Sequence, residues 1–435
     1  MRTVKLDDTT KKNLLDTLLK RSPGNYGEYN DTVTEIVERV RTEGDQALFE
    51  LTRKFDWDGI GAANVQVTEE EFREAYEKID KRLLETIRKS LKNIREYHEK
   101  QRQYSWFDST PEGTILGQKV TPLRAAGVYV PGGKAVYPSS VLMNIVPAKI
   151  AGASQVIMAT PCGKDGRVNP SVLVAAKESG ADAVYKIGGA QAIAAMAFRT
   201  ESIPKVDKIT GPGNIFVALA KKAVSGYVGI DSIAGPSEIL VLADETANPR
   251  YVAADLLSQA EHDEMASAIL VTTSEELGRR VSEEVDEFVK GLSRKEIIQK
   301  SLDNYGWILL ADSLEDAVET VNLIASEHLE IVTRNPFEVM TKIRNAGAIF
   351  LGEYSSEPLG DYFAGPNHIL PTNGTARFFS PVSVDDFVKK SSIIYYSREA
   401  LEKAHEDIEY FAKQEQLTAH ANSIHVRFEE PEKEV

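Results

Sequence analysis

The sequence contains little cysteine: Cys162 is the single one among 435 residues. One thiol excludes an internal disulfide and a thiolate-rich zinc site, and such scarcity is typical of proteins in a reducing compartment. The first residues, MRTVKLDDTTKKN, also lack the apolar core of a secretory signal peptide. We therefore expect a cytoplasmic protein.

Long apolar runs and basic clusters are absent as well. No uncharged apolar stretch reaches the ~18 residues that span a bilayer, and the richest one, 141–151, is interrupted by Asn144, Pro147 and Lys149. The chain carries 51 basic and 66 acidic residues, a net charge of −15. Its Lys and Arg residues are not grouped with aromatic ones. These features disfavour nucleic acid and membranes as partners.

What the sequence does contain is a regular alternation of short apolar strands, turns and helices. It forms two successive blocks, about 124–236 and 237–352. This alternation predicts an α/β protein whose parallel sheets are covered on both faces. We expect two incomplete, duplicated Rossmann-like blocks with a helical N-terminal segment and a small C-terminal tail domain. Ahead of the blocks, 69–103 is predicted to be highly charged helix, on which His98 should face solvent.

Glycine turns mark the expected strand ends. The usual dinucleotide fingerprint, G-x-G-x-x-G after the first strand, is missing. Three other turns follow strands and precede helices, at 130–133, 188–191 and 211–214. Amides at a helix N-terminus can bind phosphate, and glycine lets the backbone approach a ligand. Any one turn is equally well explained as a plain chain reversal, but three along one sheet edge favour a nucleotide.

Four scattered polar residues could hold a metal ion. Gln259 and His262 are three residues apart at the end of an expected helix, so they share one face. Asp361 and His420 lie downstream. Two imidazoles, a carboxylate and an amide oxygen suit Zn²⁺, and also Mn²⁺ or Co²⁺. Spacing alone is not specific, since polar residues at helix ends are commonly solvated or capping.

A second pair has the chemistry of an acid–base site. Glu327 and His328 end an expected helix and run into the strand LEIVT. A neutral imidazole accepts protons near pH 7, and a neighbouring carboxylate can orient it or activate water. The same pair could equally face solvent at a helix terminus.

Several long motifs, in one order along the chain, resemble the histidinol dehydrogenase family nearly end to end: GVYVPGG, GGAQAIAA, KITGPGN, IAGPSEILVLAD, DLLSQAEHD, ASEHLEI, GDYFAGPNHILPT and LTAHANSI. The resemblance implies a zinc-dependent, four-electron oxidation of L-histidinol to L-histidine through bound histidinaldehyde. Two NAD⁺ are consumed, and the reaction is the last step of histidine biosynthesis. It also implies an intertwined homodimer.

The resemblance further implies a role for particular residues. One Zn²⁺ per subunit would be held by Gln259, His262, Asp361 and His420. Catalysis would fall to Glu327 and His328. The substrate would contact Ser237, His328, Glu415 and the metal-binding residues Gln259, His262, Asp361 and His420, with His368 beside the site. NAD would contact Tyr129, Gln191 and Asn214.

Together these features predict four parts of the chain. A helical segment covers 1–25, and a first α/β domain with the metal and catalytic residues covers 26–123 plus 237–380. The nucleotide-binding α/β domain covers 124–236. The tail, 381–435, is too short to bury a core of its own, so it should pack on the main body or on a second subunit, and the resemblance implies the partner subunit.

Three alternatives remain at this point. A paralogous zinc- and NAD-dependent dehydrogenase could oxidise another small polar alcohol, such as a sulfonated diol, although Glu415 favours an amino alcohol. A zinc-dependent hydrolase using Glu327 as base would leave the three glycine turns without a role. A non-catalytic nucleotide-binding protein would not need the Glu327–His328 pair.

Overall fold

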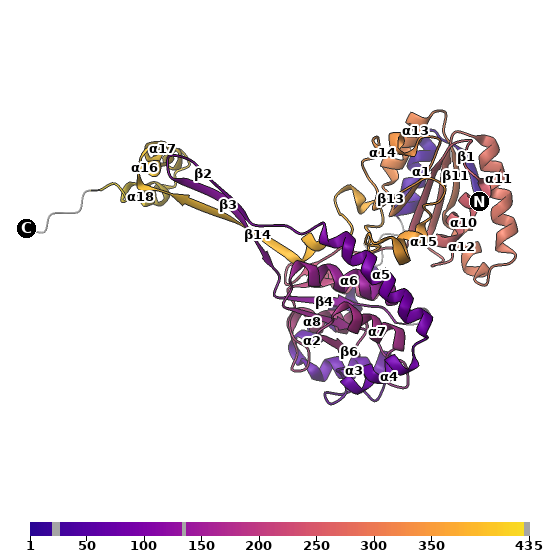
Figure 1. The fold of residues 1–435 in the computed structure, drawn as a ribbon, viewed down its shortest axis with the longest axis horizontal. Coiled ribbons are helices and arrows are strands. Elements are labelled where there is room, and N and C mark those ends of the chain that lie inside the picture. The colour runs from indigo at the N-terminus through magenta and orange to yellow at the C-terminus, as the bar shows by residue number, and fades with distance from the viewer. Residues whose placement is uncertain (20–26, 133–135, 430–435) are drawn as a thin grey trace, which may run out of the picture. The chain divides into compact units, whose positions relative to one another are not determined.

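The computed structural model of the chain (Figure 1) describes three stretches, 1–19, 27–132 and 136–429. The chain divides into two compact units. Unit 1 consists of Met1–Arg102 with Leu123–Phe387, and unit 2 consists of Gln103–Pro122 with Val388–Val435. Among the described residues, no helix is both long enough and apolar enough to cross a membrane.

Unit 1 contains a five-stranded parallel sheet in the order β6-β5-β4-β7-β8. The strands are β4 (Ala125–Tyr129), β5 (Gln155–Ala159), β6 (Ala183–Tyr185), β7 (Lys208–Thr210) and β8 (Gly229–Ile230). Numbered by sequence within the sheet this order is 3-2-1-4-5, which is the Rossmann order without its sixth strand. The crossover helices are α6 (Pro138–Ala151), α7 (Pro170–Ser179), α8 (Gly189–Phe198) and α9 (Ile215–Val224).

Four N-terminal helices cover this sheet's own helices: α2 (Gly27–Glu43), α3 (Asp45–Phe55), α4 (Glu69–Lys78) and α5 (Lys81–Glu99). Helix α2 packs on α8 and α9, α4 on α7, and α5 on α6. Their apolar stripes, represented by Val33, Leu48, Phe72 and Ile94, enter the cores of the five-stranded sheet. The expected grouping of 26–123 with 237–380 is therefore wrong for these helices.

A six-stranded parallel sheet, in the order β1-β11-β10-β9-β12-β13, forms the other part of unit 1. The strands are β1 (Arg2–Lys5), β9 (Glu238–Ala243), β10 (Ser267–Thr272), β11 (Gly306–Leu310), β12 (His328–Val332) and β13 (Ala348–Leu351). Without β1 the order is again 3-2-1-4-5, as a duplicated block predicts. The N-terminal segment is not purely helical, because its strand β1 pairs with β11.

Helices cover both faces of the six-stranded sheet. Alternate strand residues divide between two apolar cores, with Ile239 and Val241 in one and Leu240 and Leu242 in the other. The first core includes α10 (Pro249–Ala260), α11 (Glu275–Val289) and α12 (Lys295–Tyr305). The second includes α1 (Asp8–Leu19), α13 (Leu314–Ile324) and α14 (Pro336–Met340). This burial on both faces is what the continuous apolar strands predict.

Unit 2 is an antiparallel sheet, β14-β3-β2, followed by three helices. Its elements are β2 (Trp106–Ser109), β3 (Thr114–Pro122), β14 (Val388–Tyr396), α16 (Arg398–Glu402), α17 (His405–Gln414) and α18 (Thr418–His425). Strands β2 and β3 thus belong with the tail and not, as predicted from the sequence, with the first α/β domain. The tail also begins later than expected, because Val382, Val384 and Phe387 are buried in unit 1.

Candidate active site

The candidate catalytic pair lies at the amino-terminal edge of the six-stranded sheet. Strands β9 and β12 both begin there, and helix α10 ends there, because a crossover helix returns the chain to the edge at which the next parallel strand starts. This local arrangement gathers four of the residues expected from the sequence: Ser237, Gln259, Glu327 and His328.

A set of hydrogen bonds to Glu238 fixes the catalytic pair. The backbone N–H of Glu238 donates to Glu327 Oε2 at 2.9 Å. His328 Nδ1 lies 2.9 Å from the carbonyl oxygen of Glu238. A carbonyl can only accept, so Nδ1 carries a proton. His328 is 3% exposed, and Nε2 has no hydrogen-bond partner among the described residues.

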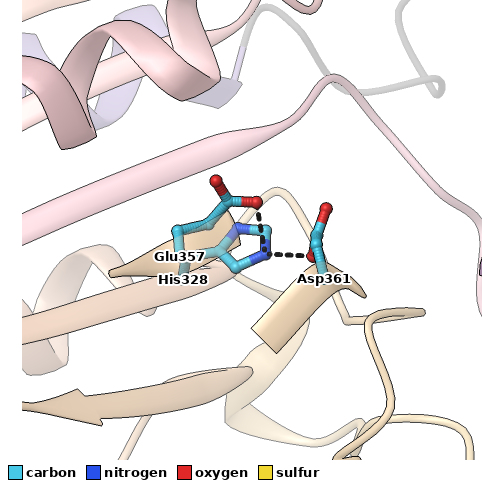
Figure 2. Close-up of side chains that lie close together, drawn as sticks. All are labelled: His328, Glu357 and Asp361. Carbon is cyan, nitrogen blue, oxygen red and sulfur yellow. Dashed lines mark ion pairs between the residues drawn. The ribbon is translucent and has the colours of Figure 1, made fainter. Parts of the chain in front are cut away.

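Two carboxyl groups face that nitrogen (Figure 2). His328 Nε2 lies 3.7 Å from Asp361 Oδ1 and 4.0 Å from Glu357 Oε1. Glu357 begins α15 (Glu357–Leu359), which continues into the π-helical turn Gly360–Ala364 that carries Asp361. Within the described residues, His328, Glu357 and Asp361 form a group whose possible ligand atoms all lie within 4.8 Å of one another.

Neighbouring side chains hold the two carboxyl groups in place. Ser258 on α10 donates its hydroxyl to Glu357 Oε2 at 3.0 Å. His368 Nδ1 donates to the backbone oxygen of Asp361 at 2.9 Å, and its Nε2 lies 3.2 Å from Ser140 Oγ. The expected neighbour His368 therefore touches the residue that the sequence assigns to the metal.

The site has more carboxyl groups than cations. Burial raises the pKa of Glu327 and that of Glu357 to about 8 each. Burial alone would lower the pKa of His328, but the carboxylates of Glu327 and Asp361 outweigh it and raise that pKa to about 10. Burial likewise opposes ionisation of Asp361, yet the nearby imidazoles of His328 and His368 lower its pKa. A cation bound among these carboxyl groups would stabilise their ionised forms.

Gln259 is placed to take part in holding that cation. The residue is 1% exposed, its Nε2 lies 3.5 Å from His328 Nδ1, and its Oε1 is buried without a hydrogen-bond partner among the described residues. His262 follows α10, and its side chain is exposed. The donor set of nitrogen and oxygen atoms fits Zn²⁺.

The other two expected residues, Glu415 and His420, belong to unit 2. Glu415 follows α17 and His420 lies on α18, and both side chains are exposed. The expected ligands are thus divided between the two units, three on unit 1 and one on unit 2.

The expected cofactor residues line one cavity of about 1200 Å³ at the carboxyl edge of the five-stranded sheet. Tyr129 ends β4, and its hydroxyl accepts the N–H of Gly189 at 3.1 Å. Gln191, in the first turn of α8, donates to Asp56 Oδ2 at 3.4 Å. Asn214 caps α9 through bonds from the N–H groups of the next turn. The first glycine turn lies partly outside the described residues, since 133–135 are not among them.

Comparison with known proteins assigns the chain to a family. The histidinol dehydrogenase family model matches residues 19–428. The histidinol dehydrogenase of Bacillus subtilis is 58% identical over 410 residues, which cover 94% of this chain and 96% of the relative. The chain belongs to the histidinol dehydrogenase family. Another member, from Caldanaerobacter subterraneus subsp. tengcongensis, is 55% identical over 428 residues, 98% of this chain and 99% of that protein.

A solved member of the histidinol dehydrogenase family has the same fold. The crystal structure of the Elizabethkingia anophelis enzyme matches with a TM-score of 0.92 and 38% identity, and the match covers 98% of each chain. The predicted fold class, the resemblance and the class of enzyme, an NAD-dependent oxidoreductase of histidine biosynthesis, are confirmed. The alternative substrates and activities are not favoured.

Two residues of this site were not expected from the sequence. Glu357 approaches His328, and the backbone of Glu238 anchors both catalytic side chains. A signal for Glu357 was present, because it precedes Asp361 by four residues, the spacing that places two side chains on one helical face. Glu238 acts mainly through its backbone, for which the sequence carries no side-chain signal, and its Oε2 also accepts the N–H of Glu327 at 3.4 Å.

Proposed function

We propose that the amino edge of the six-stranded sheet holds one Zn²⁺ and L-histidinol, and that the cavity of the five-stranded sheet holds NAD. The observation that carries this proposal is the ring nitrogen His328 Nε2, which is buried, without a hydrogen-bond partner among the described residues, and directed at two carboxyl groups. A buried polar atom of this kind usually has a partner, and in this proposal a substrate hydroxyl supplies it.

The metal ligands in this proposal are Gln259, His262, Asp361 and His420. The buried Gln259 Oε1 without a partner among the described residues and the low pKa of Asp361 support the first and third. When bound, Zn²⁺ would hold the amino and imidazole groups of the substrate and so orient its alcohol carbon. Ser237 and Glu415 would then recognise the remaining polar ends of the substrate.

His328 performs the proton transfers in this proposal. Its Nε2 accepts the hydroxyl proton of histidinol while a hydride leaves the same carbon for the first NAD⁺, which gives histidinaldehyde and NADH. Glu327 Oε1, which takes no part in the bond to Glu238, activates a water that adds to the aldehyde. After releasing its first proton to solvent, His328 accepts a proton from the hydrate as the second hydride leaves for the second NAD⁺. Two NAD⁺ and one water are consumed for each histidine formed.

The division of the site residues between two units supports a homodimer. We assign His420 and Glu415 to the site of a second copy of the chain, as in an intertwined dimer. Unit 2 exposes large apolar side chains of the kind that oligomer interfaces bury: Trp106, Phe107, Ile394, Tyr410 and Phe411, between 56% and 74% exposed. The single cysteine and the biosynthetic reaction are consistent with a cytoplasmic location.

One assay tests the function. Purified protein, NAD⁺ and L-histidinol are mixed, and NADH is followed with and without a chelator. The expected yield is two NADH for each histidinol, with histidine as product. A yield of one NADH, or an equal rate with a sulfonated diol, contradicts the proposal.

A further inference from the structure

A buried ion pair lies behind the third glycine turn, Gly211–Asn214. Lys221 on α9 pairs with Asp231, which follows β8. Their side chains are 2% and 3% exposed. Burying two charges is costly unless their remaining hydrogen-bonding groups are satisfied, so the other partners of the pair indicate what it does.

Both remaining partners belong to Gly211. Lys221 Nζ donates to the backbone oxygen of Gly211 at 3.0 Å. The backbone N–H of Gly211 donates to Asp231 Oδ2 at 2.8 Å. One ion pair therefore holds the two peptide groups on either side of this glycine.

The same glycine fits closely against strand β4. Its φ is 117°, a conformation that other residues avoid, and a Cβ built on it would lie 2.0 Å from the backbone oxygen of Tyr129. Three residues later Asn214 caps α9, with its Oδ1 3.1 Å from the N–H of Phe216. The ion pair thus fixes the turn between Tyr129 and Asn214, the two expected NAD contacts at this point.

Neither charged residue reaches the cofactor cavity. The residues that line the cavity include Tyr129, Asn214 and Gln191 but not Lys221 or Asp231. The pair can therefore affect a bound ligand only through the turn that it holds.

We propose that Lys221 and Asp231 are positioning residues for NAD. By bonding to Gly211, they hold the Gly211–Asn214 turn and the first turn of α9 in the position that binds the dinucleotide. The inference rests on the proposed binding of NAD in this cavity. It predicts that the pair governs affinity for NAD and leaves zinc and histidinol binding unchanged.

The test is the double variant Lys221→Met/Asp231→Leu in the full chain with zinc. Replacing a buried ion pair by apolar side chains of similar size commonly leaves a protein folded. The change removes both contacts to Gly211, whose peptide groups must then move to find water. We expect the dissociation constant for NAD⁺ to rise about tenfold or more, the loss of roughly one to two hydrogen bonds, with unchanged zinc content.

The matched control is Lys208→Met. Lys208 lies on the adjacent strand β7 and pairs with Asp386 at 2.6 Å, without contact to the turn. Its NAD⁺ affinity should stay within about twofold of the parent. An unchanged affinity in the double variant, or an equal loss in the control, overturns the inference.

A conservative series covers the case in which the double variant does not fold. Asp231→Asn keeps an oxygen that can accept the N–H of Gly211, whereas Asp231→Ala does not. Tighter NAD⁺ binding by the asparagine variant supports the inference, and equal binding by both overturns it. If Gln191→Ala and Asn214→Ala leave NAD⁺ affinity unchanged in the parent, the proposed cofactor site itself fails, and that outcome is distinct from failure of the ion pair alone.

Discussion

The variant His328→Asn tests the proposed role of His328 as a base while keeping the hydrogen bond that anchors its side chain. His328 donates Nδ1–H to the carbonyl of Glu238 at 2.9 Å, and the amide nitrogen of asparagine is positioned to make the same bond. The change removes Nε2, which faces Asp361 and Glu357. The fold should lose on the order of 1 kcal/mol, the cost of a small void in a buried position.

The effect on catalysis should be much larger. A positioned general base contributes about 10²- to 10⁴-fold, or roughly 3–5 kcal/mol of transition-state free energy. Because the proposed mechanism has His328 accept a proton in both oxidations, we expect both to slow by such a factor. The measurement is single-turnover formation of NADH, started once from histidinol and once from histidinaldehyde.

Glu327→Gln is the matched control for this prediction. An amide oxygen can still accept the N–H of Glu238, which lies 2.9 Å from Glu327 Oε2, but it cannot activate water. We expect this variant to oxidise histidinol to the aldehyde and to be impaired chiefly in aldehyde turnover. Alcohol oxidation by His328→Asn within about tenfold of the parent, or equal slowing of both half-reactions by Glu327→Gln, would refute these roles.

Three further predictions concern the metal, the dimer and a buried histidine. Removal of zinc by a chelator should abolish NADH formation, and added Zn²⁺ should restore it; activity that survives complete metal removal contradicts the ligand set. Phe107→Asp on unit 2 should yield an inactive monomer, as measured by sedimentation. The control Phe337→Asp, on α14 and equally exposed at 70%, should remain a dimer. If the Phe107→Asp variant also remains a dimer, unit 2 does not form the interface through this residue. Burial lowers the pKa of His98 below its ordinary 6.5, so above that pH both folded and unfolded chains hold it neutral. As the pH falls below 6.5 the unfolded chain takes up the proton first, and the free energy of unfolding should fall by up to about 1.4 kcal/mol per pH unit. In denaturant titrations at several pH values, His98→Gln should reduce the dependence of the unfolding free energy on pH. An unchanged dependence would mean that other groups cause it.

The sequence predicted the two α/β blocks because each strand is locally apolar and each helix follows it directly. The position of helices α2 to α5 could not be read in this way. Their apolar stripes show that they bury one face, but not which of two similar sheets covers it. Strand β1 has the same limitation, because its partner β11 lies some 300 residues away, as in the pairing of Val4 with Leu309.

His98 was wrongly expected to face solvent, and it is fully buried. The surrounding Glu and Lys residues suggested an exposed position. The spacing suggested otherwise, because Ile87, Leu91, Ile94 and His98 follow one another at helical intervals and all are buried. Its ring is held by Gln101 Oε1 at 2.7 Å from Nδ1. Position on the apolar stripe was a better guide than the charge of the neighbours.

The candidate sites lie at opposite edges of the two sheets, and the charge at the helix ends there gives a physical reason. In the five-stranded sheet the expected NAD contacts lie at the carboxyl edge, where α8 and α9 begin. Helix N-termini carry partial positive charge and free N–H groups, which suit a pyrophosphate. In the six-stranded sheet the polar cluster lies at the opposite, amino edge, where α10 ends with Gln259 in its last turn. Helix C-termini carry partial negative charge and favour a cation. The two sheets have the same strand order but present helix ends of opposite sign, and this difference would let one block bind the proposed anionic cofactor and the other the proposed metal ion.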